Sequence, residues 1–472
     1  MKAFDIHSDS KLDSDLRQVI PKNVALGHQV IPKQIDKEHY QFYIHSKADE
    51  VATGRYLQVL LGKTVAFEPI DGEVIELALS KFYGNTDRTS QETKNFDKNN
   101  FLDQLIFEAI ELKSSDIHVE CYEHSARVRF RINGHLVERF NLGLDNYPEL
   151  VNKIKIVARL DIAEKRLPQD GRINFSKGEI DLDLRVSVLP SLYGEKVVLR
   201  LLEKNSSAIH IEDLGLSSSE LAVYRRVVTK PNGLILISGP TGSGKTTTLY
   251  ATLKELNQED VNIVTIEDPV EYTLPGINQV QLNEKIGLGF PQALRTFLRQ
   301  DPDIVMVGEI RDVETAQMAT RAALTGHLVF STVHTNSALG IFNRLVEMGI
   351  SEYLLADTLN AGIAQRLVRV LCESCKVEAK EEEFVGHIDG LKGHRIYKAV
   401  GCVECLGTGY TGRKALYEII PNSPGLIHQI KDQSFNLNSH LGELGLATLQ
   451  VNAINFLKEG KTSVEEVLPL LI

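Results

Sequence analysis

The chain has few cysteines and no long apolar run. Four of its five cysteines form two pairs late in the sequence and Cys121 stands alone, a distribution that argues against a disulfide framework. No run approaches the roughly 20 apolar residues that a membrane helix needs. The first residues also lack the apolar core of a signal peptide. We therefore expect a cytoplasmic protein that is peripheral to the inner membrane through its partners.

Positive charge is not in excess either. The chain carries 52 Lys and Arg against 63 Asp and Glu, for a net charge of −11. This composition does not indicate a nucleic-acid surface, although a local basic patch can hide in an acidic total. Hydrophobic content of 43% and charged content of 24% are ordinary for a globular protein. The length of 472 residues exceeds what one core can organise and predicts two to four domains.

The residue pattern changes along the first half of the chain. Residues 1–90 predict a small N-terminal domain, α/β or helical, that ends in an amphipathic helix at 73–83. A polar stretch follows and predicts a flexible linker, which we assign to 91–100. Residues 101–205 predict an α+β domain with alternating strand patterns and a hairpin turn at Asn133-Gly134.

Residues 206–472 predict the remaining domain. Strands and helices alternate from about 206 to 365, which indicates an α/β fold with a mostly parallel sheet and helices on both faces. The segment that follows contains the cysteine pairs, at 372–405, and then mainly helical sequence.

One stretch of this domain matches the phosphate-loop motif G-x-x-x-x-G-K-[ST] at every fixed position. An apolar run at 234–237 predicts a strand before it, and 247–256 predicts a helix after it. Glycines permit close backbone approach to polyphosphate, and a helix N-terminus supplies positive potential. A Gly-rich turn without function is the alternative, and it does not explain this context. The residues expected to contact a nucleoside triphosphate are Gly239, Pro240, Thr241, Gly242, Ser243, Gly244, Lys245, Thr246 and Thr247.

Hydrolysis of a triphosphate also needs a metal ion and a residue that orients water. Lys245 can reach the β and γ phosphates, and the Thr246 hydroxyl can ligate Mg²⁺. Carboxylates follow two apolar strands whose C-terminal ends should converge on the ligand. Glu267 and Asp268 follow one strand, and for them a role in capping a turn stays open. Glu309 follows the other strand and favours a role with Mg²⁺ or water.

A further apolar strand has a histidine at each end, His327 and His334. A strand-end histidine beside a nucleotide can sense the γ-phosphate through a hydrogen bond. A lone histidine is more often a structural residue, so both interpretations stay open on the residues alone.

The two cysteine pairs are C-x-x-C units in one segment. Four thiolates with this spacing suit tetrahedral Zn²⁺, whereas a redox pair needs only one unit. The expected ligands are Cys372, Cys375, Cys402 and Cys405, and nearby glycines at 401, 407 and 409 suit the tight turns of a knuckle. With no open coordination position indicated, the metal should be structural, and Cys121 is interpreted as a thiol without a role.

Several motifs occur together and in order, and together they resemble the secretion ATPase superfamily that drives type II secretion and type IV pilus assembly. The resemblance covers about residues 100–425. It departs from the usual pattern at Asn133, where Asp is usual, and at Cys121, where Pro is usual. The motifs are the phosphate loop, the segments 265–272, 298–303, 308–312 and 326–335, and, in the α+β domain, 115–118, 129–131, 167–172 and 183–187.

The resemblance implies a RecA-like phosphate-loop ATPase domain preceded by a PAS-like α+β domain, with a zinc knuckle. It implies that Glu271 polarises the attacking water and that Glu309 is the Walker B carboxylate near Mg²⁺. It places His327 by the nucleotide, with His334 in support. It also implies that the smaller domain contributes arginines that neutralise charge in the transition state, for which a surface ion pair is the alternative. These are Arg172, Arg185 and Arg200.

The expected function is therefore a hexameric ATPase motor that uses ATP, Mg²⁺ and Zn²⁺. Its expected partners are the inner-membrane platform and cytoplasmic-domain proteins of the machine, with no nucleic acid. The short N-terminal domain favours type II secretion, by assembly of a pseudopilus, over type IV pilus extension. The tetracysteine module is usually absent from pilus-retraction members. A nucleic-acid translocase and a scaffold that binds nucleotide without hydrolysis are the alternatives from other classes.

Overall fold

Three hydrophobic cores form in the computed structural model, one in each of three successive parts of the chain. The structure describes residues 22–35, 39–83, 100–178, 180–203, 209–379, 393–423 and 436–471, with residues 2, 3, 6, 12, 16, 19, 20, 91, 92, 391, 426 and 429 besides. The chain divides into two units. The first comprises Met1–Leu202, Leu371–Val377 and Lys398–Thr411, and the second comprises Glu203–Val370, Glu378–Tyr397 and Gly412–Ile472. Every helix in the described residues is too short or too polar to cross a lipid bilayer.

The N-terminal part of the first unit is an α/β module rather than a helical one. Its strands lie in the order β1 (Lys2–Ala3), β2 (Val30–Ile35), β3 (His39–His45) and β4 (Thr64–Ile70). Its helices are α2 (Lys22–Gly27), α3 (Glu50–Leu61) and α4 (Gly72–Tyr83). Asp49 starts α3, because its side chain accepts hydrogen bonds from the amides of residues 51 and 52. The α4 range confirms the amphipathic helix expected from the sequence.

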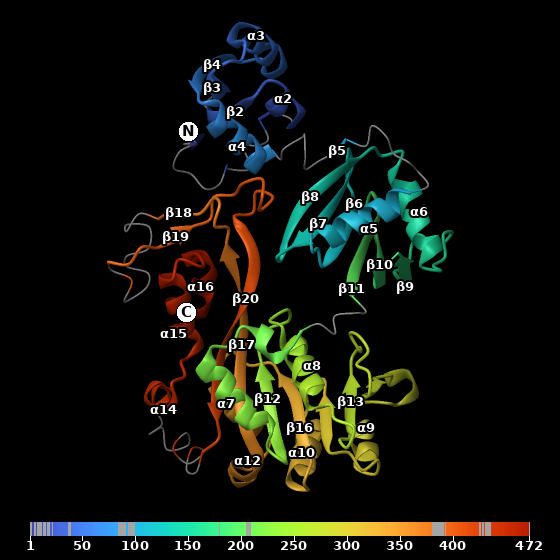
Figure 1. Ribbon diagram of the computed structural model, residues 1–472. Helices are drawn as coiled ribbons and strands as arrows, with labels where there is room; N and C mark the ends of the chain where they lie inside the picture. Colours follow the sequence, from blue (N-terminus) through green and yellow to red (C-terminus); the bar gives the residue numbers. More distant parts are fainter. Residues whose placement is uncertain are drawn as a thin grey trace. The chain divides into compact units, whose positions relative to one another are not determined.

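A seven-stranded sheet forms the α+β part of the first unit (Figure 1). Its order is β5 (Gln91–Glu92), β8 (His135–Leu142), β7 (Ala126–Ile132), β6 (Asp116–Cys121), β11 (Gly194–Glu203), β10 (Ile180–Ser191) and β9 (Gln169–Lys177). Alternate residues of β7 are buried, because helices α5 (Phe101–Glu111) and α6 (Tyr147–Val157) cover one face. Asn133 and Gly134 have φ of 49° and 86°, as the expected hairpin turn requires. The expected linker lies mostly outside the described residues, apart from β5 and Asn100.

The second unit is built on another seven-stranded sheet. Its order is β14 (Asn278–Gln281), β13 (Ile263–Glu267), β15 (Ile304–Val307), β16 (Leu328–Val333), β12 (Gly233–Ser238), β17 (Leu359–Leu371) and β20 (Tyr410–Pro421). The pairs from β14 through β17 are all parallel. Strands β12, β13, β15 and β16 are buried at every position, because helices cover both faces. The main helices are α7 (Ser218–Val228), α8 (Lys245–Leu256), α9 (Phe290–Phe297), α10 (Val313–Leu324), α11 (Ala338–Glu347) and α12 (Glu352–Thr358).

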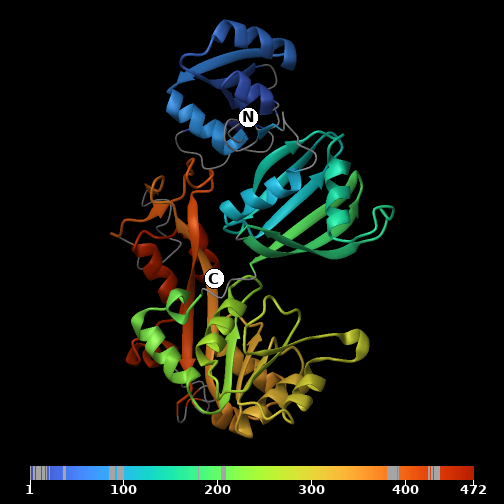
Figure 2. The same ribbon diagram turned by 45° about the vertical axis from the view of Figure 1, so that its right-hand side comes forward.

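Strand β20 corrects the expectation of mainly helical sequence after the cysteine pairs. Helices α14 (Leu437–Glu443), α15 (Leu449–Lys458) and α16 (Val464–Leu471) are present, but β20 precedes them. Figure 2 shows β17 and β20 as the two long orange strands of this sheet. Residues 415–421 are buried without alternation. A short continuous apolar run does not distinguish a buried strand from a buried helix, which is why the sequence pattern missed it.

Candidate nucleotide site and cysteine cluster

The phosphate loop follows the C-terminal end of β12 and opens into α8. Gly244, with φ of 86°, immediately precedes the helix. A Cβ atom on Gly239 would lie 2.5 Å from both the Gln365 carbonyl oxygen and the Ser243 hydroxyl oxygen. Only glycine fits there, so the backbone stays open to a close-lying phosphate.

Lys245, the first residue of α8, turns its side chain back over this loop. Its Nζ donates to the carbonyl oxygens of Gly239, at 2.7 Å, and Pro240, at 3.1 Å. Burial lowers the pKa of Lys245; the charge of Glu309 opposes this shift and that of Arg366 adds to it. Arg366 is a second cation at the same loop, because a Cβ on Gly239 would also lie 3.2 Å from its Nη1, and two cations there favour binding of an anion.

Gln365 and Arg366 are the residues that motif reasoning missed. They follow Ala364 in β17, which pairs with Ser238 at the end of β12. Gln365 accepts from the Thr248 hydroxyl at 2.9 Å and donates to the Ser243 carbonyl at 2.9 Å, so it braces the loop against α8.

The guanidinium of Arg366 donates to the carbonyl oxygens of Gln365, at 3.0 Å, and Asn336, at 2.8 Å. Burial lowers its pKa, and the charge of Glu418 opposes that shift. Because both hydrogen-bond partners are neutral, its charge remains available to an anion. Only the pairing of β12 with β17 reveals this, since the two segments are far apart in sequence.

Glu309 lies after β15, at the same edge of the sheet. Its carboxylate forms an ion pair with Arg311, and one oxygen lies 3.2 Å from Nε2 of His334, which follows β16. The Glu309 side chain is 13% exposed, so it remains reachable from solvent. We call Lys245, Glu309, His334, Gln365 and Arg366 the phosphate edge. It gathers at the C-terminal ends of β12, β15 and β16, beside the middle of β17, at the edge where ligands bind in parallel sheets.

His327, which the resemblance places beside the nucleotide, lies away from the phosphate edge in this chain. It precedes β16, and its carbonyl accepts from the amide of Gly233 at the start of β12. Its Nδ1 lies 2.9 Å from the Ala322 carbonyl oxygen. The six-residue strand β16 separates it from His334 by about 20 Å. A strand brings only one of its two ends to a ligand, and in this unit that end carries His334.

The carboxylates of the acidic segment after β13 lie in different environments. Glu267 is only 3% exposed. It accepts hydrogen bonds from the Tyr250 hydroxyl, from Thr265 Oγ1 at 2.6 Å and from Gln279 Nε2 at 3.1 Å. Because these three donors occupy its carboxylate, Glu267 stabilises the conformation of the segment. Asp268 is exposed and Glu271 is half-buried, so both can meet water.

The three arginines of the first unit share the sheet face opposite its core. Arg172 and Arg185 lie directly opposite each other on β9 and β10. Arg200 on β11 pairs through Nε with Asp116 Oδ1 at 2.9 Å, and Arg131 Nε lies 3.4 Å from the other oxygen of that carboxylate. Arg200 thus forms a surface ion pair, while its side chain stays 60% exposed. All three belong to a different unit from the phosphate loop.

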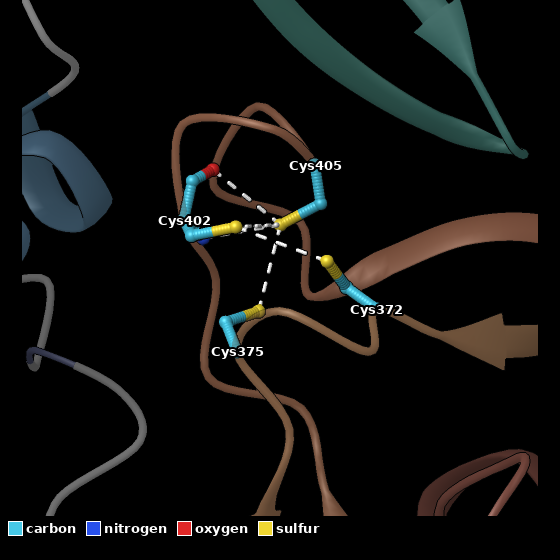
Figure 3. Close-up of side chains that lie close together, drawn as sticks. All are labelled: Cys372, Cys375, Cys402 and Cys405. Atoms are coloured by element: carbon cyan, nitrogen blue, oxygen red, sulfur yellow. Dashed lines mark hydrogen bonds between the residues drawn. The ribbon is translucent and has the colours of Figure 1, made fainter.

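The four late cysteines converge on one point (Figure 3). Their sulfur atoms lie 3.7 Å apart between Cys402 and Cys405, and 3.8 Å apart in the pairs Cys372–Cys402 and Cys375–Cys405. A tetrahedron with Zn–S bonds of about 2.3 Å has edges of about 3.8 Å. A disulfide needs sulfur atoms about 2.05 Å apart, so these distances fit a shared metal ion instead.

Backbone amides support this cluster. The amides of Cys402, at 3.0 Å, and Gly409, at 3.1 Å, donate to the Cys405 sulfur. Burial opposes ionisation of this thiol, but these amides outweigh it and lower its pKa. A Cβ on Gly401 would lie 2.5 Å from the Gly407 carbonyl oxygen, so the turn requires glycine there.

Comparisons with known proteins agree with this geometry. Residues 91–469 match the family model described as Type II/IV secretion system protein. The type IV pilus assembly ATPase PilB of Myxococcus xanthus is 39% identical and spans 97% of this chain and 87% of its own. The type II secretion system protein E of Pseudomonas aeruginosa is 46% identical and spans 78% of this chain and 74% of its own. The solved structure of the pilus retraction motor PilT with bound ADP is 27% identical, with a TM-score of 0.52, and covers 78% of this chain and 96% of that one.

Proposed function

This chain belongs to the type II/IV secretion system protein family, and we propose that it hydrolyses ATP to drive assembly of a pilin-like filament. The phosphate edge carries this proposal, because it gathers two cations, a carboxylate and a histidine around a glycine loop. The similar PilT structure contains ADP, which supports a nucleotide at the same loop.

We propose the following roles for the residues of the phosphate edge and their neighbours. Lys245 and Arg366 bind the phosphates, and the Thr246 hydroxyl and Glu309 hold Mg²⁺, which neutralises charge on the phosphates. Glu271 orients and polarises the attacking water. His334 positions the Glu309 carboxylate through the contact of 3.2 Å. A rate assay with ATP and Mg²⁺ tests the activity directly, and absence of turnover by the purified assembly would contradict it.

Arg366 offers a test of phosphate binding that no motif suggests. We expect Arg366→Gln to raise the Kd for ATP about tenfold, because a hydrogen bond to a charged group contributes more than a neutral one. Isothermal titration or a fluorescent ATP analogue measures this. Arg321→Gln, on the exposed face of α10, removes the same charge away from the loop and should leave the Kd unchanged. Equal Kd values for both variants would remove Arg366 from the site.

We propose that the chain works as a hexameric ring in which Arg172, Arg185 and Arg200 serve a nucleotide. Arg185→Ala should lower kcat by at least about 100-fold and change the Kd for ATP little, because its partner charge develops only during hydrolysis. Arg166→Ala is the control, since its side chain is 89% exposed in the same unit. Wild-type specific activity should also rise with protein concentration as rings form. Flat activity across dilution, with normal turnover in Arg185→Ala, would contradict this proposal.

Of the two systems, we propose type II secretion, in which the motor would build a pseudopilus with an inner-membrane platform. The 46% identity to a type II secretion protein E supports it. Type IV pilus assembly is the second candidate, because the PilB relative also matches the N-terminal module and so spans 97% of the chain. Deleting the gene and scoring both secreted enzymes and surface pili separates them. Loss of pili with normal secretion would favour the second.

We also propose that the four clustered thiolates hold one structural Zn²⁺. The tetrahedral sulfur spacing supports this, and all four positions of a tetrahedral ion would be filled by protein. The metal would join two turns of the chain that lie about 30 residues apart.

A further inference from the structure

The hydroxyl of Tyr250 connects α8 to the acidic segment. The side chain is 1% exposed and lies one helical turn after Thr246, on the same side of α8. Its hydrogen is donated to the Glu267 carboxylate. Its oxygen accepts from the backbone amide of Glu271 at 3.3 Å and from Gln279 Nε2 at 3.4 Å. One donor and two acceptor sites are all that a phenol offers, so its bonding capacity is fully used.

The ring of Tyr250 contacts the same segment a second time. It packs edge to face against the ring of Tyr272, with centroids 4.6 Å apart. The two contacts therefore hold residues 271 and 272 from one side chain. Burial, and then the charge of Glu267, raise the pKa of Tyr250, so the phenol stays protonated and keeps its donor at every working pH.

The segment needs such support because it has little regular structure of its own. Residues 268–277, which the structure describes throughout, form neither helix nor strand. The Glu271 amide is therefore not fixed by a sheet or helix ladder. Gln279 adds a second brace, since it donates to the Tyr272 carbonyl at 3.1 Å and accepts from the Leu274 amide at 2.6 Å.

We propose that Tyr250 is a positioning residue for ATP hydrolysis, which fixes Glu271 relative to the first turn of α8. That turn contains Lys245 and Thr246, so Tyr250 sets the distance between the phosphate-binding groups and the carboxylate that polarises water. This inference rests on the proposed role of Glu271. Displacing a catalytic group by about 1 Å can cost about 100-fold in rate.

Tyr250→Phe tests this in the full-length assembly, because it keeps the ring and removes only the hydroxyl. We expect kcat to fall between about 10-fold and 100-fold, with the Kd for ATP within about twofold of wild type. Tyr224→Phe is the matched control. Tyr224 is also fully buried, and its hydroxyl lies 2.5 Å from Thr252 Oγ1 of the same helix, but its bond does not involve the acidic segment. Tyr224→Phe should keep kcat within about twofold.

A double-mutant cycle with Glu271→Gln distinguishes positioning from a general loss of packing. If Tyr250 acts through Glu271, adding Tyr250→Phe to Glu271→Gln should not lower the residual kcat further. The same fold-loss in both backgrounds, or equal effects of Tyr250→Phe and Tyr224→Phe, would overturn the inference. Should Tyr250→Phe fail to fold, Tyr272→Ala removes the ring that packs against Tyr250 and must also lower kcat.

The role of Glu271 and the positioning role of Tyr250 can be tested independently. Normal turnover in Glu271→Gln would overturn the role of Glu271, and this inference with it. Slow turnover in Glu271→Gln together with normal turnover in Tyr250→Phe would overturn the positioning role alone.

Discussion

Glu271→Gln is expected to leave ATP bound while lowering kcat by about 10²- to 10⁴-fold. The amide keeps the size and hydrogen-bonding shape of the carboxylate but cannot accept a proton from the attacking water. Because Glu271 is half-buried after β13 and Lys245 begins α8, removing the carboxylate leaves the phosphate contacts in place. Glu284→Gln, an exposed carboxylate in the short helix Glu284–Ile286, is the control and should turn over normally.

Lys245→Ala should differ from Glu271→Gln in weakening ATP binding as well as hydrolysis. It deletes the cation at the loop, so ATP affinity and hydrolysis should both fall, the affinity by at least about tenfold. Equilibrium binding of ATP and steady-state kcat for the two variants measure this contrast. Equal loss of affinity in Lys245→Ala and Glu271→Gln would contradict the separation of phosphate binding from water activation.

Some parts of the site can be predicted from the sequence because the residues that form them are close together in the chain. The loop from Gly239 to Thr246 needs only a preceding strand, glycines and a helix start, and all three occur within one short stretch. The cysteine spacing is likewise informative, since two C-x-x-C units in one segment predict four sulfur atoms that come together, as they do in the structure. The amphipathic helix at 73–83 and the turn at Asn133-Gly134 are also predicted from local sequence, as α4 and the positive φ angles of that turn show.

The remainder of the site depends on sheet order, which a sequence pattern does not contain. Arg366 reaches the loop only because β17 pairs with β12. His327 and His334 flank one strand, and only the direction of β16 decides which of them lies with Glu309. The residue pattern alone does not distinguish Glu267 from Glu271, which only the family resemblance singles out, because the two differ in burial and in hydrogen bonding by Tyr250 and Gln279.

The metal content of the protein tests the cysteine cluster. We expect about one tightly bound zinc ion per chain in protein purified without added metal, because sulfur spacings of 3.7 to 3.8 Å fit a tetrahedral site. Elemental analysis measures this. Cys402→Ser should abolish the zinc, since removing one of four thiolates weakens a site whose binding free energy is about 10–16 kcal/mol in small zinc modules.

Losing the zinc should unfold the knuckle and leave the nucleotide loop intact. The turns at 372–375 and 402–405 belong to a different unit from the loop, whose bracing comes from Gln365 and Thr248. We therefore expect Cys402→Ser to make the segment around the cysteines sensitive to protease while the Kd for ATP stays within about threefold. Cys121→Ser removes the fifth thiol as a control and should retain the metal. Zinc near zero in wild type, with melting unchanged by a chelator, would show that the four thiols hold no structural metal.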